Sequence, residues 1–218
     1  MSVRMPEADQ AVLARRDKIV AALRTIVPGE GVIAGEREMK PFETDGLTAY
    51  RQQPMVVVLP ETTEQVSQVL HYCHDEGIKV VPRGAGTSLS GGALPLVDGV
   101  LLGMAKFNRI REIDFDNRAA VVEPGVTNLA VSNAVAHAGF YYAPDPSSQI
   151  ACTIGGNIAE NSGGLHCLKY GLTTNNLLGV KFVLPGGEMI TLGGKAPGPG
   201  GLDLLGLITG SEGLLGMV

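Results

Sequence analysis

The stretch Pro82-Arg83-Gly84-Ala85-Gly86-Thr87-Ser88-Leu89-Ser90-Gly91-Gly92 places four glycines and three hydroxyl side chains within eleven residues. It follows Ile78–Val81, a short apolar run with the composition of a buried strand. Glycine tolerates positive φ and lets a ligand approach the backbone, and successive free N–H groups form a concave anion site. The loop is therefore a candidate site for a phosphate or pyrophosphate; the alternative is a tight connection between two strands.

Neither of the two common phosphate-binding motifs fits this loop. A dinucleotide fingerprint needs G-x-G-x-x-G at the start of a helix and an acidic residue about 20 positions later. Here Leu89 occupies the third glycine position, and Met104 to Lys106 lie where the acid is required. A Walker A loop needs Gly-Lys-Ser/Thr, but no lysine occurs between Lys79 and Lys106. The rest of the chain must therefore decide between the two interpretations.

The residues before the loop predict a parallel β-α-β unit. Met55–Leu59 is a valine-rich run typical of a buried strand, and Ile78–Val81 is the second strand. Thr62 is placed to cap a helix between them, and Gly77 is placed to end it. An apolar stripe follows helical spacing along this helix: Val66, Val69, Leu70 and Cys73. Short connections between strand, helix and strand favour parallel pairing.

The remaining elements are predicted from periodicity and turn residues. We expect a helix over 7–27 and an irregular linker over 30–54, then strands at 100–104, 110–113 and 119–123. These are followed by a helix over 127–137, a hairpin over 180–192, a Pro/Gly loop over 196–201 and a short helix over 203–208.

Composition excludes several classes of protein. The chain has 218 residues, 44% hydrophobic and 18% charged, which argues against disorder. Its net charge of −5 argues against nucleic-acid binding. Three scattered cysteines without C-x-x-C argue against a disulfide framework, a zinc site or an iron–sulfur site. Charged residues interrupt the first 24 positions, and the apolar runs are too short to span a bilayer. We expect a cytoplasmic protein without a metal site or a membrane span.

A second glycine-rich region strengthens the ligand interpretation. Pro144-Asp145-Pro146-Ser147-Ser148 leads to Thr153-Ile154-Gly155-Gly156-Asn157 and then to Asn161-Ser162-Gly163-Gly164. Two glycine pairs so close together are costly in backbone entropy, and a backbone surface wrapped around a ligand explains them. No Lys or Arg occurs between Pro144 and Gly164. A pyrophosphate would therefore be held by N–H groups and hydroxyls, helped at most by Arg83.

Four motifs in order resemble the flavin domain of the vanillyl-alcohol oxidase/p-cresol methylhydroxylase (PCMH) family. They are Pro-Arg-Gly-Ala-Gly-Thr-Ser at 82–88, Thr-Ile-Gly-Gly-Asn at 153–157, Asn-Ser-Gly-Gly at 161–164 and Gly-Ser-Glu-Gly-Leu-Leu-Gly-Met-Val at 210–218. The stretch 163–171 resembles the subfamily of FAD-linked D-subunits of bacterial glycolate oxidases, akin to D-lactate dehydrogenases. The resemblance covers the chain from about residue 40.

The resemblance implies an α+β fold of the PCMH type with two α/β subdomains. One is small and based on the β-α-β unit; the other is larger, with a mixed or antiparallel sheet and helices. It implies an N-terminal helix and linker over 1–53 and an FAD-binding domain over 54–218. Full members continue into a substrate cap domain that carries the catalytic residues. We therefore expect the domain to be truncated at its C-terminal end, the catalytic residues beyond Val218 and this fragment alone to be inactive.

The resemblance also assigns cofactor-binding residues. The loop 83–88 would cradle the FAD pyrophosphate, residues of the second region would line the flavin and ribityl chain, and residues 212–218 would approach the adenine or close the pocket. The predicted set is Arg83, Gly84, Ala85, Gly86, Thr87, Ser88, Pro144, Asp145, Thr153, Gly156, Asn157, Ser162, Gly163, Glu212, Gly213 and Val218. Thr87 stands where relatives with histidyl-linked flavin carry histidine, so we expect non-covalent FAD.

The function implied is oxidation of a small 2-hydroxy acid, glycolate or D-lactate, with hydride passing from the α-carbon to flavin N5. Electrons would leave through partners: a second flavin subunit and an iron–sulfur subunit, which would bring the protein to the periphery of the inner membrane. One alternative is a non-catalytic flavin-binding fragment. Another is a different flavin reductase or oxidase on the same scaffold, such as an NADPH-dependent cell-wall sugar reductase.

Two histidine-containing pairs have simpler interpretations than a metal site or a covalent flavin link. His71 and His74 share a helical face, but no third metal ligand is evident. His166 and Cys167 lie in the second glycine-rich region, where a covalent flavin link is the alternative to a hydrogen-bonded histidine and a packed cysteine.

Overall fold

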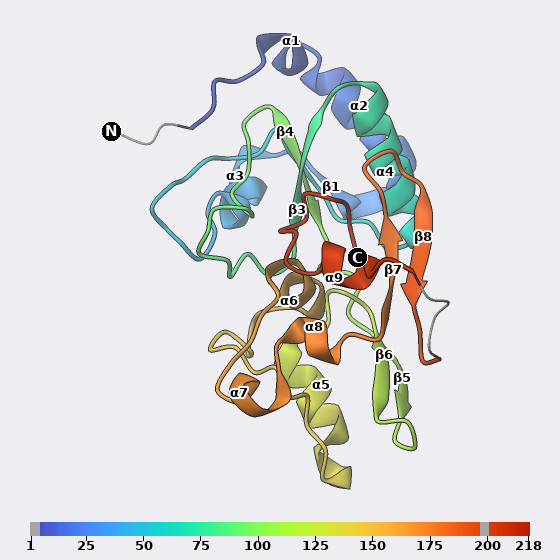
Figure 1. Cartoon of the computed structure of the whole chain (residues 1–218). Helices are drawn as coiled ribbons and strands as arrows, with labels where there is room; N and C mark the ends of the chain where they lie inside the picture. Colours follow the sequence, from blue (N-terminus) through green and yellow to red (C-terminus); the bar gives the residue numbers. More distant parts are fainter. Residues whose placement is uncertain (1–4, 197–200) are drawn as a thin grey trace.

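A four-stranded mixed sheet forms the upper part of the molecule (Figure 1). The computed structural model describes residues 5–196 and 201–218, so most of the predicted Pro/Gly loop lies outside the described residues. The strand order is β1 (Val32–Ile33), β2 (Val56–Val58), β4 (Gly99–Gly103) and β3 (Lys79–Arg83). β4 is parallel to β2 and β3, whereas β1 is antiparallel to β2 at the edge.

The predicted β-α-β unit is confirmed, with one addition. Helix α4 (Thr63–Asp75) joins β2 to β3, Thr62 Oγ1 accepts from Gln65 N at 3.2 Å, and Gly77 ends the segment with φ 66°. β4 inserts between the two strands of the unit. Every residue of β4 is buried, which suits the centre of a sheet covered on both faces.

The N-terminal segment covers both faces of this sheet. The predicted helix is two helices, α1 (Gln10–Leu13) and α2 (Arg16–Ile26), and α2 packs with α4 against Val56 and Val100. On the other face, Met39 of α3 (Glu36–Met39) packs against Val57 and Leu101. β1, α3 and two 3-10 turns (Gly29–Gly31 and Lys40–Phe42) lie where an irregular linker was expected. Elements this short leave no periodicity in a sequence.

The second half of the chain is built of hairpins and short helices around its own core. The strands and the first helix are β5 (Ile110–Asp114), β6 (Ala119–Val122), α5 (Asn128–Val135, continued by a 3-10 turn at Ala136–Ala138), β7 (Gly179–Val183) and β8 (Met189–Gly193). The other helices are α6 (Ile154–Glu160), α7 (Cys167–Tyr170), α8 (Thr173–Asn176) and α9 (Leu204–Ile208). Val131, Ile158 and Phe182 lie in this second core. The predicted strands, the 180–192 hairpin and the helices at 127–137 and 203–208 are confirmed within a few residues.

The second glycine-rich region contains a helix that the glycine pattern did not predict, because Gly155 and Gly156 lie in α6. Thr153 caps this helix, since its Oγ1 accepts from Gly156 N at 3.3 Å. Gly155 rests on Pro124, where a Cβ atom would lie 2.8 Å from the proline Cβ. This tertiary contact overrides the poor helix propensity of glycine and explains why the residue is small.

The C-terminal segment ties the two parts together. Val183 of β7 and Met217 form an isolated bridge, with N–O distances of 2.8 and 2.9 Å, and both side chains enter the first core. Ser67 on α4 donates to Gly187 O in the β7–β8 turn at 2.6 Å.

In the part of the chain that the structure covers, none of the helices has the length and apolar character needed to cross a bilayer.

Candidate functional site

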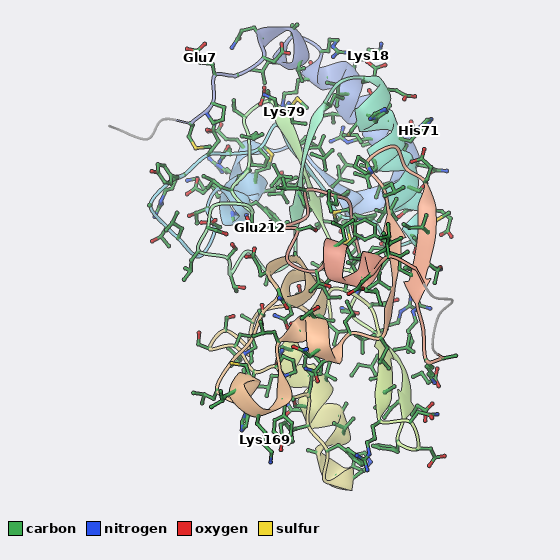
Figure 2. The ribbon with its side chains drawn as sticks, viewed as in Figure 1. Glu7, Lys18, His71, Lys79, Lys169 and Glu212 are labelled. Atoms are coloured by element: carbon green, nitrogen blue, oxygen red, sulfur yellow. The ribbon has the colours of Figure 1, made fainter. Side chains whose placement is uncertain are left out.

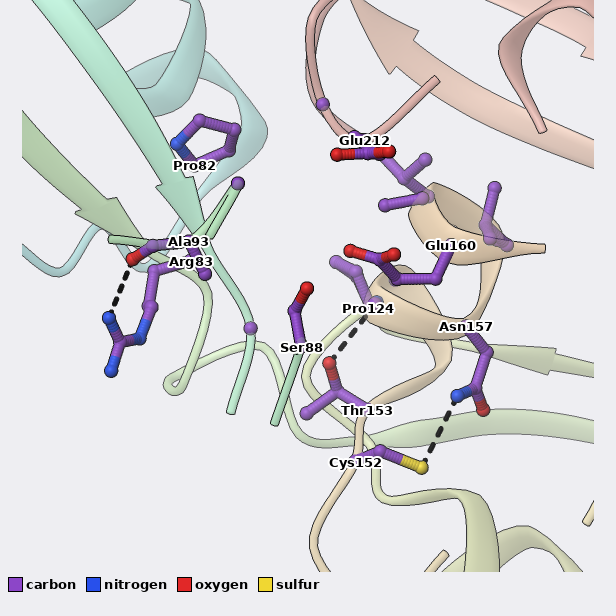
Figure 3. A pocket seen from close by; sticks show the side chains of 18 of the residues that line it. Pro82, Arg83, Ser88, Ala93, Pro124, Cys152, Thr153, Asn157, Glu160 and Glu212 are labelled. Carbon is purple, nitrogen blue, oxygen red and sulfur yellow. Dashed lines mark hydrogen bonds between the residues drawn. The ribbon is translucent and has the colours of Figure 1, made fainter. Parts of the chain in front are cut away.

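A cleft of about 500 Å³ lies where the loop after β3, the start of α6 and residues 211–218 meet (Figure 3). Most of the predicted cofactor-binding residues line it: Arg83, Gly84, Ala85, Gly86, Thr87, Ser88, Thr153, Gly156, Asn157, Ser162, Glu212, Gly213 and Val218. Pro144, Asp145 and Gly163 are not among its lining residues. Met104, Phe182 and Ile208 add an apolar wall that sequence reasoning missed, because they come from three segments that are far apart along the chain.

The two glycine-rich regions touch within the cleft. A Cβ atom on Gly84 would lie 2.5 Å from Thr153 Oγ1, the same oxygen that caps α6. On the opposite wall, a Cβ atom on Gly213 would lie 2.4 Å from Pro82 Cγ. Glycine at these positions lets three distant segments approach to backbone distance.

A continuous run of backbone N–H groups without partners lies in the first loop. Within residues 5–196 and 201–218, the N–H groups of the five residues Gly84–Ser88 have no hydrogen-bond partner. At the start of α6, by contrast, Ile154 N donates to Val126 O at 2.9 Å and Gly155 N to Pro124 O at 2.8 Å. The first N–H groups of that helix are thus already engaged, and the loop offers the cleft a continuous row of unpaired amides.

Arg83 does not point into the cleft, contrary to its expected contact with a pyrophosphate. Figure 3 shows its guanidinium turned toward Ala93, and Nη1 donates to Ala93 O at 2.7 Å. Nη2 donates to Thr44 O. The residue is 7% exposed, and burial lowers the pKa of the guanidinium against the opposing charge of Asp45. The side chain therefore donates to a carbonyl oxygen just after the loop and to one in the N-terminal segment, on the side of the loop away from the cleft.

A buried amide pair supports the far side of the cleft. Asn128, fully buried, donates from Nδ2 to Pro144 O at 2.7 Å and to Asn157 Oδ1 at 2.8 Å. Asn157 Nδ2 in turn donates to Cys152 Sγ at 3.2 Å and Ser162 Oγ at 3.3 Å. Asn157 therefore holds the walls of the cleft together. Asn128 was not predicted; in the sequence it is only the residue after a helix cap.

Asp145 lies outside the cleft and is paired with His166. The distance from His166 Nδ1 to Asp145 Oδ2 is 2.6 Å, and His166 N donates to Asp145 Oδ1 at 3.2 Å. Burial opposes ionisation of Asp145, but these hydrogen bonds outweigh it and lower the pKa of the carboxyl. Gly164 packs on the same residue, where a Cβ atom would lie 2.2 Å from Asp145 Oδ1. The hydrogen-bonded interpretation of His166 is confirmed.

The charges that face the cleft are negative. The carboxylates of Glu160 and Glu212 both point into it (Figure 3). Glu212 N donates to Ala159 O at 2.8 Å, and its backbone has a positive φ of 53°. Figure 2 shows Lys18 and Lys169 toward opposite ends of the molecule, with Glu212 between them. Arg83 is the only Lys or Arg among the described lining residues, and no histidine is among them.

Comparison with known proteins gives one family. Residues 54–193 match the family described as FAD binding domain. The chain is 56% identical to the glycolate oxidase subunit GlcD of Escherichia coli K12 over 202 residues, which is 93% of this chain and 40% of that protein. It is 44% identical to the subunit of the same name from Bacillus subtilis, over 81% of this chain and 38% of that protein. Identity to a D-lactate dehydrogenase of Archaeoglobus fulgidus is 40%, over 81% of this chain and 40% of that enzyme.

Solved structures agree on the fold. Alkyldihydroxyacetonephosphate synthase superimposes with a TM-score of 0.77 at 21% identity, covering 100% of this chain and 40% of that one. Physcomitrella patens BBE-like 1 gives a TM-score of 0.73 at 24% identity, covering 93% of this chain and 42% of that one. The chain thus has the PCMH-type fold of these proteins and spans about two fifths of the length of the curated relatives cited above.

Proposed function

The chain belongs to the FAD binding domain family, and on that premise we propose that the cleft holds FAD non-covalently with its diphosphate on the loop Gly84–Ser88. The observation that carries the proposal is the row of five amides, unpaired among the described residues, that lines the cleft. Successive unpaired N–H groups form a concave anion site, and one anion can accept hydrogen bonds from several of them at once. Gly84 and Gly86 leave no room for a Cβ atom behind this row, so the backbone itself is the binding surface.

The rest of the cleft suits the other parts of the cofactor. Glu160 and Glu212 would repel a phosphate, but their carboxylates accept hydrogen bonds from hydroxyl groups such as those of a ribose or ribityl chain. Met104, Phe182 and Ile208 offer apolar surface for a planar ring. Non-covalent binding is supported at Thr87, which cannot form the histidyl link that some flavoproteins have.

We propose that the whole protein is an FAD-dependent oxidoreductase acting on the CH–OH group of a small 2-hydroxy acid, glycolate or D-lactate. The names of the E. coli and A. fulgidus relatives support this reaction class. When bound, the flavin supplies the hydride acceptor. The residues of this chain bind the cofactor, orient it and exclude water from its diphosphate.

A non-catalytic role for the chain alone is the second candidate, and the composition of the cleft favours it. Oxidation of a hydroxy acid needs a group to take the hydroxyl proton and a cation to hold the carboxylate. Among the described lining residues the guanidinium of Arg83, the one Lys or Arg, is engaged with carbonyl oxygens, and the carboxylates of Glu160 and Glu212 would repel a substrate carboxylate. We propose that this chain binds the flavin but does not supply the cation that holds the substrate.

We propose that electrons pass to a second flavin subunit and an iron–sulfur subunit. We also propose that the protein lies in the cytoplasm and that these partners bring it to the periphery of the inner membrane. The E. coli relative is named as a subunit, which supports an assembly. Cys73 and Cys152 lie buried and Cys167 lies half-buried in α7, so this chain's cysteines are dispersed rather than clustered for an iron–sulfur centre.

Titration of the purified chain with FAD tests the cofactor proposal. We expect saturable quenching of flavin fluorescence with one FAD per chain, and release of all flavin into the supernatant on acid precipitation. Fluorescence that stays that of free FAD at every protein concentration would refute binding. Flavin that remains with the precipitate would refute the non-covalent attachment.

A further inference from the structure

Arg83 ties together three segments that are distant along the chain. Its backbone ends β3, its Nη1 reaches Ala93 O at the far end of the glycine loop, and its Nη2 reaches Thr44 O in the N-terminal segment. One side chain therefore connects the beginning of the loop to its end and fastens both to residue 44. Two hydrogen bonds in different directions are suited to the planar fork of a guanidinium.

The middle of the loop rests on the same group. Gly86 has φ 70°, and a Cβ atom there would lie 2.4 Å from Arg83 Nε and 2.4 Å from Nη2. Gly46 packs behind the next residues, since its Cβ would lie 2.7 Å from Thr87 O and 2.9 Å from Ser88 O. Two carbonyl groups of the loop thus face Gly46, which does not line the cleft, whereas their amides are left without protein partners.

The guanidinium is also a buried charge without an ion pair. In the described parts of the chain, no carboxylate lies within 4.0 Å of it. Asp45 is the nearby acid; it is 5% exposed, its Oδ1 accepts from Leu47 N at 3.0 Å, and its Oδ2 has no described partner. A guanidinium stays protonated even when buried, and a charge in such surroundings is poorly screened.

We infer that Arg83 is a positioning residue for the FAD diphosphate: it holds the amides of Gly84–Ser88 in an anion-binding arrangement from behind and adds a positive charge without touching the phosphates. The inference rests on the proposed function. It also makes the segment 43–48 a working part of the site, although the family match begins only at residue 54.

Substitution of Arg83 in the full chain tests this. Arg83→Met removes the charge and both hydrogen bonds, whereas Arg83→Lys keeps the charge and reaches one carbonyl. Exposed Arg118, in the β5–β6 turn, supplies the matched control Arg118→Met. Affinities for FAD and for riboflavin, which lacks the diphosphate, are measured by fluorescence quenching over a series of NaCl concentrations.

We expect Arg83→Met to weaken FAD binding by about tenfold or more, and by the same factor at every NaCl concentration because salt screens a buried charge little, and to leave riboflavin binding unchanged. Arg83→Lys should restore part of the FAD affinity, and Arg118→Met should match wild type. Equal losses for FAD and riboflavin would show that Arg83 has only a structural role and would overturn the inference. Wild-type FAD affinity in Arg83→Met would overturn it as well.

A glycine pair keeps the inference testable if Arg83→Met does not fold. Gly86→Ala and Gly77→Ala impose similar backbone strain, because both glycines have positive φ (70° and 66°). Only at Gly86 would the added Cβ atom also meet the Arg83 guanidinium. Of the two variants, we expect only Gly86→Ala to lose FAD affinity. Equal affinities in the two variants would contradict the positioning role of Arg83. If the wild-type chain binds no FAD, the proposed function fails instead, so the two failures are distinguishable.

Discussion

Gly84 lies so close to Thr153 that a Cβ atom on the glycine would be 2.5 Å from the threonine Oγ1. This contact joins the loop that carries the free amides to the cap of helix α6, across 69 residues of chain. The hydroxyl that fills the space is already engaged, because it accepts from Gly156 N. It cannot move aside without uncapping the helix.

Gly84→Ala should therefore separate the loop from α6. We expect a loss of about 1–3 kcal/mol in the free energy of unfolding, as for other overpacked sites, and weaker FAD binding. Chemical denaturation and flavin fluorescence measure the two effects. The double variant Gly84→Ala/Thr153→Ala removes the hydroxyl that the new methyl group would meet, so it serves as the comparison that should recover part of the lost FAD affinity, although it also removes the helix cap. An alanine variant with wild-type stability and affinity would contradict the contact.

Asn128→Ala should destabilise the fold although Asn128 does not line the cleft. The substitution leaves Pro144 O and Asn157 Oδ1 without their buried donor. We expect the free energy of unfolding to fall by about 2–4 kcal/mol, measured by urea denaturation. Exposed Asn108 provides the control Asn108→Ala, for which we expect little change. Similar values for the two variants would show that the buried amide pair contributes nothing.

The Asp145–His166 pair predicts a loss of stability in acid. Hydrogen bonds from His166 lower the folded-state pKa of Asp145 despite burial. A lowered carboxyl pKa stabilises the fold above the unfolded value, about 4, and this contribution disappears as the pH falls through the folded value. Denaturation between pH 6 and acid should show a smaller decline for Asp145→Asn than for wild type. Parallel pH profiles would contradict the assignment.

Reduction of a dye by glycolate or D-lactate should not be catalysed by this chain loaded with FAD. Among the described residues that line the cleft, the one Lys or Arg donates to carbonyl oxygens, and Glu160 and Glu212 would repel the carboxylate of the substrate. Absorbance of the dye is followed with free FAD at the same concentration as the control. Turnover clearly above that control would show that the chain carries a carboxylate-binding group that the cleft does not reveal.

The amino-acid sequence by itself determined the features that depend on neighbours along the chain. The cap at Thr62, the turn at Gly77 and the valine run before them are local, and the β-α-β unit follows from them. The glycine loop after β3 was also evident, because positive φ and close backbone approach require a particular residue type. The 180–192 hairpin was predicted on the same grounds.

Tertiary structure alone decided which groups face the cleft. Three features depend on residues far apart in sequence: the insertion of β4 between β2 and β3, the packing of helical Gly155 on Pro124, and the pairing of Asn128 with Asn157. The direction of Arg83 is the clearest case. The glycine pattern of the loop indicates free amides, but it does not indicate where the Arg83 side chain lies. The carbonyl oxygens of Thr44 and Ala93 accept from the guanidinium, and only the folded chain brings these two oxygens together beside the loop.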